Sequence, residues 1–150
     1  NHDYWWSAIG KIRAALPEGM YALQNDALEL DGLVVAGTRG WTVPGSSNFG
    51  PQDEKVYSRE LERLRLSLRA AAQLPGRRRV VMLHYPPTNF KLEPSGFTEL
   101  IRRAAPDALV FGHLHGEDGQ RVIRELDDIA VYYVAADALR FTPQLIFESV

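Results

Sequence analysis

Ala108-Leu109-Val110-Phe111-Gly112-His113-Leu114-His115 joins a short apolar run to a glycine and two histidines. Val80-Val81-Met82-Leu83-His84 has the same design, because another apolar run ends directly in a histidine. Short apolar runs of this kind are typical of strands that are buried on both faces of a sheet. In open α/β sheets, ligands bind beyond the carboxyl ends of such strands. We therefore expect His84, His113 and His115 to lie at one edge of a buried sheet in an α/β fold.

Helices are predicted before and between these strands, where apolar residues recur every three or four positions. The first predicted helix covers residues 4–16. The longest covers residues 53–74 and has an apolar stripe on one side, whereas Glu60 is expected to face solvent. A third lies near residues 97–104. The segment 39–52 is rich in glycine and proline and predicts a long loop, and long ordered loops are often functional.

Further strands are expected on both sides of the two apolar runs. The predicted strands cover residues 20–24, 27–38, 121–124, 131–135 and 145–148. Tight turns at Asn25-Asp26 and Asp31-Gly32 divide the first of these segments into a hairpin or meander. Strands and helices together predict a mixed α/β class.

The composition excludes several classes of protein. The 150 residues, 45% of them hydrophobic, suffice for one domain with a core. The formal net charge of −2 gives no sign of a nucleic-acid binder. No cysteine is present, which excludes disulfides and thiolate zinc sites and fits a reducing compartment, so we expect a cytoplasmic protein. No apolar run reaches the roughly 18 residues of a membrane span, so no membrane partner is expected.

The spacing of His113 and His115 determines what this pair can do. On an extended segment, side chains two residues apart share a face, so both can point into one site while Leu114 packs away. Gly112 is expected to permit a tight bend where the strand becomes a loop. Imidazoles favour zinc, iron, manganese or nickel over calcium. A structural role stays open for each histidine, because buried histidines are more often hydrogen-bonded core residues and H-x-H pairs also occur in surface loops.

All four histidines lie in three blocks, Asn1-His2-Asp3, Leu83-His84-Tyr85-Pro86-Pro87 and Gly112-His113-Leu114-His115. Their order resembles the last three motif blocks of the calcineurin-like metallophosphoesterases, whose pattern runs D-x-H, G-D-x-x-D, G-N-H-D/E, H and G-H-x-H. The segment Gly37-Thr38-Arg39-Gly40-Trp41 looks like one in an uncharacterised bacterial group of predicted phosphohydrolases. The resemblance implies that residues 1–150 are the C-terminal half of a single domain, a four-layer α/β/β/α sandwich with mixed sheets. The N-terminal part, with the D-x-H and G-D-x-x-D blocks, is expected to be absent from this chain.

The resemblance also implies a role for each residue of these blocks. One metal ion would be bound by three residues, Asn1, His84 and His113. His115 would bind the other ion. His2 would be the catalytic histidine, and Asp3 would orient it through a hydrogen bond or cap the helix that follows. The two ions would be divalent transition metals, namely Mn, Fe, Zn or Ni.

The implied activity is hydrolysis of a phosphomonoester or phosphodiester by metal-activated water. Two cations close together neutralise the phosphoryl oxygens and lower the pKa of a bridging water. Because this chain holds only part of the binuclear site, the isolated chain is expected to be inactive or weakly active. Its missing N-terminal half, or another chain, is expected to cover the exposed face of the sheet.

Two other functions stay open. A domain of the same fold could bind metal or act as a scaffold without catalysis. A cyclic-nucleotide phosphodiesterase is suggested by His84-Tyr85-Pro86-Pro87, which resembles the H-H-P-P of that branch of the superfamily. Arg39 and Asn89 lie in loops that could shape a substrate entrance, but surface-loop roles are favoured for both.

Overall fold

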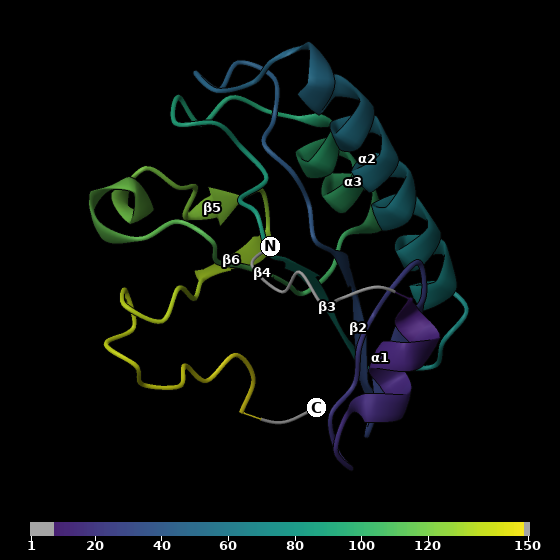
Figure 1. The fold of residues 1–150 in the computed structure, drawn as a ribbon. Coiled ribbons are helices and arrows are strands. Elements are labelled where there is room, and N and C mark those ends of the chain that lie inside the picture. Colours follow the sequence, from purple (N-terminus) through teal and green to yellow (C-terminus); the bar gives the residue numbers. More distant parts are fainter. Residues whose placement is uncertain (1–7, 149–150) are drawn as a thin grey trace.

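The computed structural model describes residues 8–148 of the protein (Figure 1). Its first helix, α1, spans Ile9–Ala15 and confirms the described part of the first predicted helix. Asn1, His2 and Asp3 lie outside the described residues, and so do the roles that the sequence predicts for them.

One mixed sheet of six strands organises the fold. Its strands are β1 (Ala27–Leu30), β2 (Leu33–Thr38), β3 (Arg78–Leu83), β4 (Ala108–Phe111), β5 (Glu125–Leu126) and β6 (Ile129–Tyr133). They lie in the order β1-β2-β3-β4-β6-β5. The inner strands β2, β3, β4 and β6 are parallel, whereas β1 and β5 pair antiparallel with their neighbours at the two edges. The predicted α/β class is thus confirmed, and so are the strands expected at the two apolar runs.

Helices α2 (Pro51–Ala71) and α3 (Gly96–Ala104) connect the parallel strands and lie on the same face of the sheet (Figure 1). Pro51 begins α2 at a position where a missing amide hydrogen costs no helical hydrogen bond. Ser95 caps α3, because its side chain accepts a hydrogen bond from the Phe97 N–H at 3.1 Å. One core joins the helices to the sheet, and its most buried members are Leu64, Phe97, Ile101, Leu109 and Phe111.

These connections bring the carboxyl ends of the four parallel strands to one edge of the sheet. Asp31 and Gly32, with φ of 52° and 92°, form the tight turn predicted between β1 and β2. The crossovers through α2 and α3 return the chain to the amino end of the sheet before β3 and β4, and the segment 112–128, which contains β5, does so before β6. The carboxyl edge therefore begins at four strand ends, Thr38, Leu83, Phe111 and Tyr133.

The face of the sheet opposite α2 and α3 is less covered. Met82, Val110 and Tyr132 are neighbours across β3, β4 and β6, so they lie in one row on this face. Met82 is 46% exposed, although the residues on either side of it in the chain are buried. The Tyr132 hydroxyl donates to the carbonyl of Ile146 at 3.5 Å. The C-terminal segment therefore covers only part of this face.

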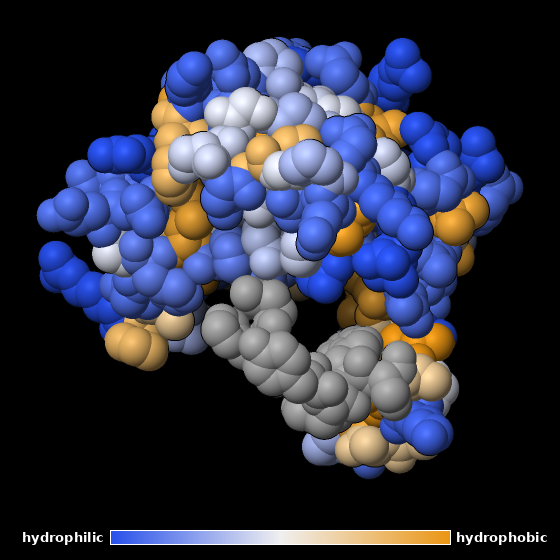
Figure 2. Space-filling view, turned by 45° about the horizontal axis from the view of Figure 1, so that its top comes forward, coloured by the Kyte–Doolittle hydropathy of each residue, from blue (hydrophilic) through white to orange (hydrophobic). Residues whose placement is uncertain are grey.

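The surface of the molecule is mostly hydrophilic on the side shown in Figure 2, with apolar residues in scattered patches. Exposed large apolar side chains occur in several segments of the described chain, at Met20, Tyr21, Leu66, Met82, Phe90, Leu92, Phe141 and Leu145. Within residues 8–148, no helix combines the length and the apolar character needed to cross a lipid bilayer.

The strand predicted over residues 20–24 is wrong. Met20 and Tyr21 are 57% and 60% exposed, so their apolar surface meets no second strand. The Arg13 guanidinium instead donates to the carbonyl of Ala22 at 2.9 Å, which satisfies a backbone acceptor without a strand partner. A short apolar run can therefore stay irregular when no partner strand lies beside it.

The strands predicted over residues 121–124 and 145–148 are also wrong. A 3₁₀ helix, Gly116–Gln120, precedes the first of them. Val122 and Ile123 are buried, although the backbone at these residues is irregular. The second is irregular up to residue 148. The apolar residues of the first segment are buried as expected, but burial does not determine the backbone conformation.

Candidate metal centre

Backbone hydrogen bonds continue beyond the parallel strands and hold the carboxyl edge together. His84 and Tyr85 donate their N–H groups to the carbonyl of Arg39 at 3.1 and 2.9 Å, which ties the end of β3 to the end of β2. The Gly112 N–H donates to the carbonyl of His84 at 3.2 Å, which ties β4 to β3. The residues that follow each strand therefore keep fixed positions relative to one another.

His84 and His113 face each other across this edge. Nε2 of His84 lies 3.1 Å from Nδ1 of His113, and the ring planes meet at 71°. One of these two nitrogens donates and the other accepts when the rings are hydrogen-bonded to each other. Two imidazole nitrogens that bind the same ion at about 2.0–2.1 Å lie about 2.9–3.4 Å apart, depending on the angle at the metal. The observed separation therefore fits two ligands of one ion.

The surroundings of His84 favour its neutral form. Burial, together with the nearby His113, Arg39 and His115, lowers the pKa of His84 from 6.5 to about 4. Burial is the largest of these causes, because it removes water from the charged ring. At neutral pH the imidazole therefore keeps a lone pair, and the neutral ring is the form that binds metal ions.

His113 has a left-handed backbone conformation, with φ of 76°. This conformation costs a residue other than glycine about 1–2 kcal/mol. Tyr85 stacks on the imidazole of His113, with ring centroids 3.9 Å apart and planes at 32°. The Leu114 N–H donates to the carbonyl of Gly112 at 3.0 Å, which closes the turn around His113. Strain of this kind persists where the surroundings hold the residue in place, and it is concentrated at functional sites.

The bend that the sequence predicts at Gly112 lies instead at His113. A Cβ added at Gly112 would lie 3.8 Å from its nearest neighbour, the backbone nitrogen of Ala135, which is an ordinary contact. The left-handed turn also ends the extended segment, so His113 and His115 meet different partners. His113 contacts His84, and His115 contacts Asp137. The extended backbone that the sequence-based argument assumed is therefore absent at His113.

His115 forms a second pair with Asp137, which follows β6. Nδ1 of His115 lies 2.8 Å from Oδ1 of Asp137, and the Gly116 N–H donates to Oδ2 at 2.9 Å. The hydrogen bond from Gly116, and then the one from His115, lower the pKa of Asp137 to about 2. The side chain of His115 is 66% exposed. An ionised carboxylate thus holds an imidazole that is open to solvent.

The sequence alone does not predict Asp137 as part of the site. The pattern that marks His84, an apolar run followed by a polar side chain, also occurs before Asp137. The apolar run predicted over residues 131–135 ends two residues before it. That run forms β6, which pairs parallel with β4. Without this pairing, nothing in the sequence brings Asp137 beside His115.

Glu60 lies beneath the same edge and is fully buried, which overturns the expectation that it faces solvent. Its carboxylate accepts hydrogen bonds from the Thr38 hydroxyl at 2.8 Å and from Arg39 and Arg63 at 3.1 and 2.8 Å. A buried carboxylate requires partners of this kind. The Arg39 guanidinium also lies 4.6 Å from the centre of the Trp41 ring. Arg39 is therefore engaged with groups of the protein, which favours the structural role expected for it.

Asn89 also has a structural role, because its side chain joins two loops. Its Oδ1 accepts hydrogen bonds from the N–H groups of Lys91 and Glu93 at 2.9 and 3.2 Å. Its Nδ2 donates to the Glu93 carboxylate at 2.6 Å and to the carbonyl of Pro44 at 3.3 Å. The loops that border the carboxyl edge are thus fixed to each other.

Within residues 8–148, no three histidine or carboxylate side chains lie close enough together to hold one metal ion. His84 and His113 form one pair, and His115 forms another with Asp137. The further ligand that the sequence predicts, Asn1, lies outside the described range. Structural and catalytic zinc sites use three or four protein ligands, so the described residues supply part of a coordination shell.

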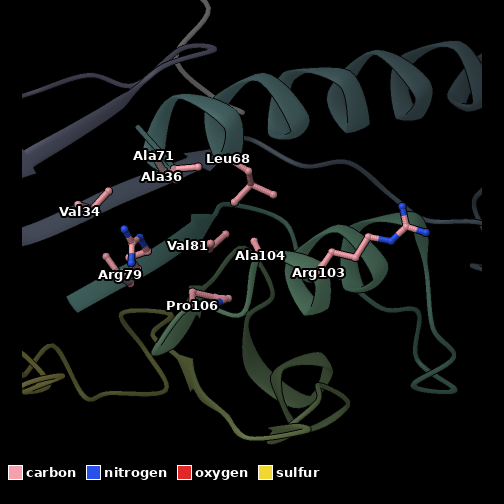
Figure 3. Close-up of a pocket in the computed structure, with 11 residues that line it drawn as sticks. Val34, Ala36, Leu68, Ala71, Arg79, Val81, Arg103, Ala104 and Pro106 are labelled. Atoms are coloured by element: carbon pink, nitrogen blue, oxygen red, sulfur yellow. The ribbon is translucent and has the colours of Figure 1, made fainter. Parts of the chain in front are cut away.

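A separate hollow of about 210 Å³ opens near the amino ends of the strands, between α2 and α3 (Figure 3). Its wall is mainly apolar and includes Val34, Ala36, Leu68, Ala71, Val81, Ala104 and Pro106. Figure 3 shows Arg103, on the rim, extending away from these residues. The lining contains no histidine and no carboxylate, so it is a poorer place for chemistry than the carboxyl edge.

Comparison with protein-family models, with curated proteins and with solved structures gives no match. The resemblance of the motif blocks to metallophosphoesterases therefore stays a prediction.

Proposed function

We propose that this chain carries part of the binuclear metal site of a phosphoesterase that hydrolyses a phosphomonoester or a phosphodiester. One observation supports this most strongly. Nε2 of His84 and Nδ1 of His113 face each other at 3.1 Å, beyond the carboxyl ends of two parallel strands. Metal ions bound in such a site neutralise phosphoryl oxygens and make water a nucleophile near neutral pH.

The residues of the chain have separate tasks in this proposal. His84 and His113 would hold one ion, since His84 is neutral at pH 7 and the two nitrogens have the spacing of shared ligands. Tyr85 limits the rotation of His113 by stacking on its ring. His115 would serve the second ion. Imidazole ligands suit divalent transition metals, so Mn, Fe, Zn or Ni is proposed for both positions.

Metal content and turnover test the proposal on the full-length protein. Hydrolysis of p-nitrophenyl phosphate and of bis-p-nitrophenyl phosphate is measured for the wild type, His84→Ala and His113→Ala. We expect kcat/KM to fall by at least about 100-fold in both variants, because loss of an outer partner of a metal ligand already costs 10–100-fold. Tyr21→Ala is the control, since it removes an exposed ring far along the chain from the site. Unchanged turnover in both histidine variants would refute the phosphoesterase proposal.

A second candidate is a metal-binding domain without catalytic activity. It is supported by the same facing pair, His84 and His113, because two imidazoles can hold an ion whether or not a substrate binds there. This candidate predicts that metal content depends on His84 and His113 and that neither phosphate ester is hydrolysed. The same experiment therefore separates the two functions.

The proposal includes a partner for the face of the sheet opposite α2 and α3. Met82, which is 46% exposed there, would be covered by another chain or by another part of the same protein. Sedimentation of the wild type as a single compact monomer, unaffected by Met82→Lys, would contradict a covering chain.

A further inference from the structure

Asp137 uses both carboxylate oxygens at the carboxyl edge. Oδ1 lies 2.8 Å from Nδ1 of His115, and Oδ2 accepts the Gly116 N–H at 2.9 Å. These bonds join the loop after β4 to the loop after β6. The starts of both loops are also joined, because the Val134 N–H donates to the carbonyl of Phe111 at 2.8 Å.

The chemistry of this contact decides where the hydrogen of His115 lies. An ionised carboxylate can only accept hydrogen bonds, so Nδ1 of His115 must donate. A neutral imidazole with its hydrogen on Nδ1 has its lone pair on Nε2. The side chain is 66% exposed, so a dissolved ion can reach it.

We infer that Asp137 is a positioning residue, which fixes His115 in the Nδ1–H tautomer so that Nε2 keeps the lone pair needed to bind a metal ion. This inference rests on the proposed function for the identity of the ligand. Metal-binding histidines commonly donate their second ring N–H to a carboxylate, and that contact sets the tautomer and the ring orientation. Asp137 has this relation to His115.

The hydrogen bond from Gly116 to Asp137 determines which way an asparagine at position 137 would turn. The Gly116 N–H is a donor that cannot turn away, because it belongs to the backbone. In Asp137→Asn, the amide oxygen must therefore face Gly116, and the amide nitrogen faces His115. That nitrogen donates, so Nδ1 of His115 has to accept and the ring hydrogen moves to Nε2. The substitution keeps the size of the side chain and is expected to reverse the tautomer.

Nitrogen NMR of the metal-free, ¹⁵N-labelled full-length protein measures the tautomer directly. Two-bond ¹H–¹⁵N correlation, recorded near pH 8, distinguishes a protonated ring nitrogen from a bare one. We expect the wild type to show His115 protonated at Nδ1 and Asp137→Asn to show it protonated at Nε2. An Nε2–H tautomer in the wild type, or an unchanged tautomer in the variant, would overturn the inference.

Asp107→Asn is a matched control. Asp107 also accepts a backbone N–H, from Arg79 at 2.7 Å, and a side-chain N–H, from Arg78 at 2.9 Å, but it faces no histidine. The His115 signals should not change in this variant. Unchanged His84 and His113 signals in Asp137→Asn would show that the site keeps its fold, so a tautomer change there reports the single contact.

Titration with Zn²⁺, followed by calorimetry and by the His115 signals, extends the test to metal binding. Affinity at His115 should fall 10–100-fold in Asp137→Asn. Equal affinity in the two proteins, despite a reversed tautomer, would overturn the positioning role. If the tautomers respond as expected and the wild type neither binds Zn²⁺ nor hydrolyses phosphate esters, the proposed function fails and the effect of Asp137 on His115 stands.

Discussion

The carboxyl and amino ends of the parallel strands differ in the side chains that surround them. At the carboxyl end, His84 faces His113, which has a left-handed backbone conformation, and His115 pairs with Asp137. The carboxylate of Glu60 is buried near the end of β2. At the amino end, α2 and α3 enclose an apolar hollow of about 210 Å³ without a histidine or a carboxylate in its lining. The histidines therefore lie at the carboxyl end, whereas the hollow at the amino end has a mainly apolar lining.

Under the proposed function, the two ends have different roles, because the carboxyl end would bind metal and the amino end would contribute stability. Polar groups and strain cost stability, and they are retained where function requires them. The well-packed residues near the hollow, such as Val34 with no exposed surface, contribute through burial instead. Substitutions at the carboxyl end should therefore change metal binding, and substitutions at the amino end should change the free energy of unfolding.

The largest effect is expected for His113→Ala at the carboxyl end. It removes one of the two facing nitrogens, so the affinity of the His84 and His113 pair for Zn²⁺ should fall at least about 100-fold, or about 2.7 kcal/mol. Isothermal titration calorimetry measures this loss. Equal affinity in the variant would remove the distinction between the two ends.

Val34→Ala is the counterpart at the amino end. Removing two methyl groups from a fully buried position should lower the free energy of unfolding by about 1–3 kcal/mol. Affinity for Zn²⁺ should not change, because Val34 lies at the start of β2, away from the histidines. Urea denaturation and calorimetry on the same samples test both statements. A weaker Zn²⁺ affinity at equal folded fraction would show that the two ends are coupled.

A pH dependence is expected from His84. Its pKa is about 4 in the folded protein and 6.5 in an ordinary environment, so the unfolded chain binds more protons between these values. The stability that the neutral ring contributes is complete above about pH 6.5 and is lost as the pH falls toward about 4. The unfolding free energy of the wild type should thus fall more steeply in this window than that of His84→Gln. Parallel slopes for the two proteins would contradict the burial of a neutral His84.

The smallest effect is expected for His113→Gly compared with His113→Ala. Both variants lose the imidazole, but glycine adopts φ near 76° without strain. The glycine variant should be more stable by about 1 kcal/mol, a value reduced by the greater flexibility of glycine in the unfolded chain. Thermal unfolding of the metal-free proteins measures the difference. Greater stability of the alanine variant would show that position 113 is not strained.

The sequence predicts the strands that carry this site better than it predicts the contacts between the side chains of the site. Two apolar runs that end in histidines suffice to predict β3, β4 and the placement of His84 and His113, because carboxyl ends of parallel strands meet at one edge. Asp137 could not be placed, since its position beside His115 depends on the pairing of β4 with β6. That pairing joins segments that no local pattern relates.

Glu60 shows a different limit of sequence-based reasoning. The charge of Glu60 suggests that it faces solvent, although its spacing from Tyr57 and Leu64 matches the buried side of α2. Glu60 is nevertheless buried, because Thr38 and Arg39 fold over it and satisfy its carboxylate. Partners supplied by a distant segment decide whether a charged side chain can be buried.

Cadmium NMR tests whether His84 and His113 bind one metal ion together. The ¹⁵N-labelled protein is loaded with ¹¹³Cd²⁺, and one-bond coupling between the metal and the ring nitrogens is recorded. We predict coupling of a single ¹¹³Cd signal to Nε2 of His84 and to Nδ1 of His113, the two nitrogens that lie 3.1 Å apart. Coupling to only one of these rings, to the opposite nitrogen of either ring, or to two separate ¹¹³Cd signals would show that the two facing nitrogens do not share one ion.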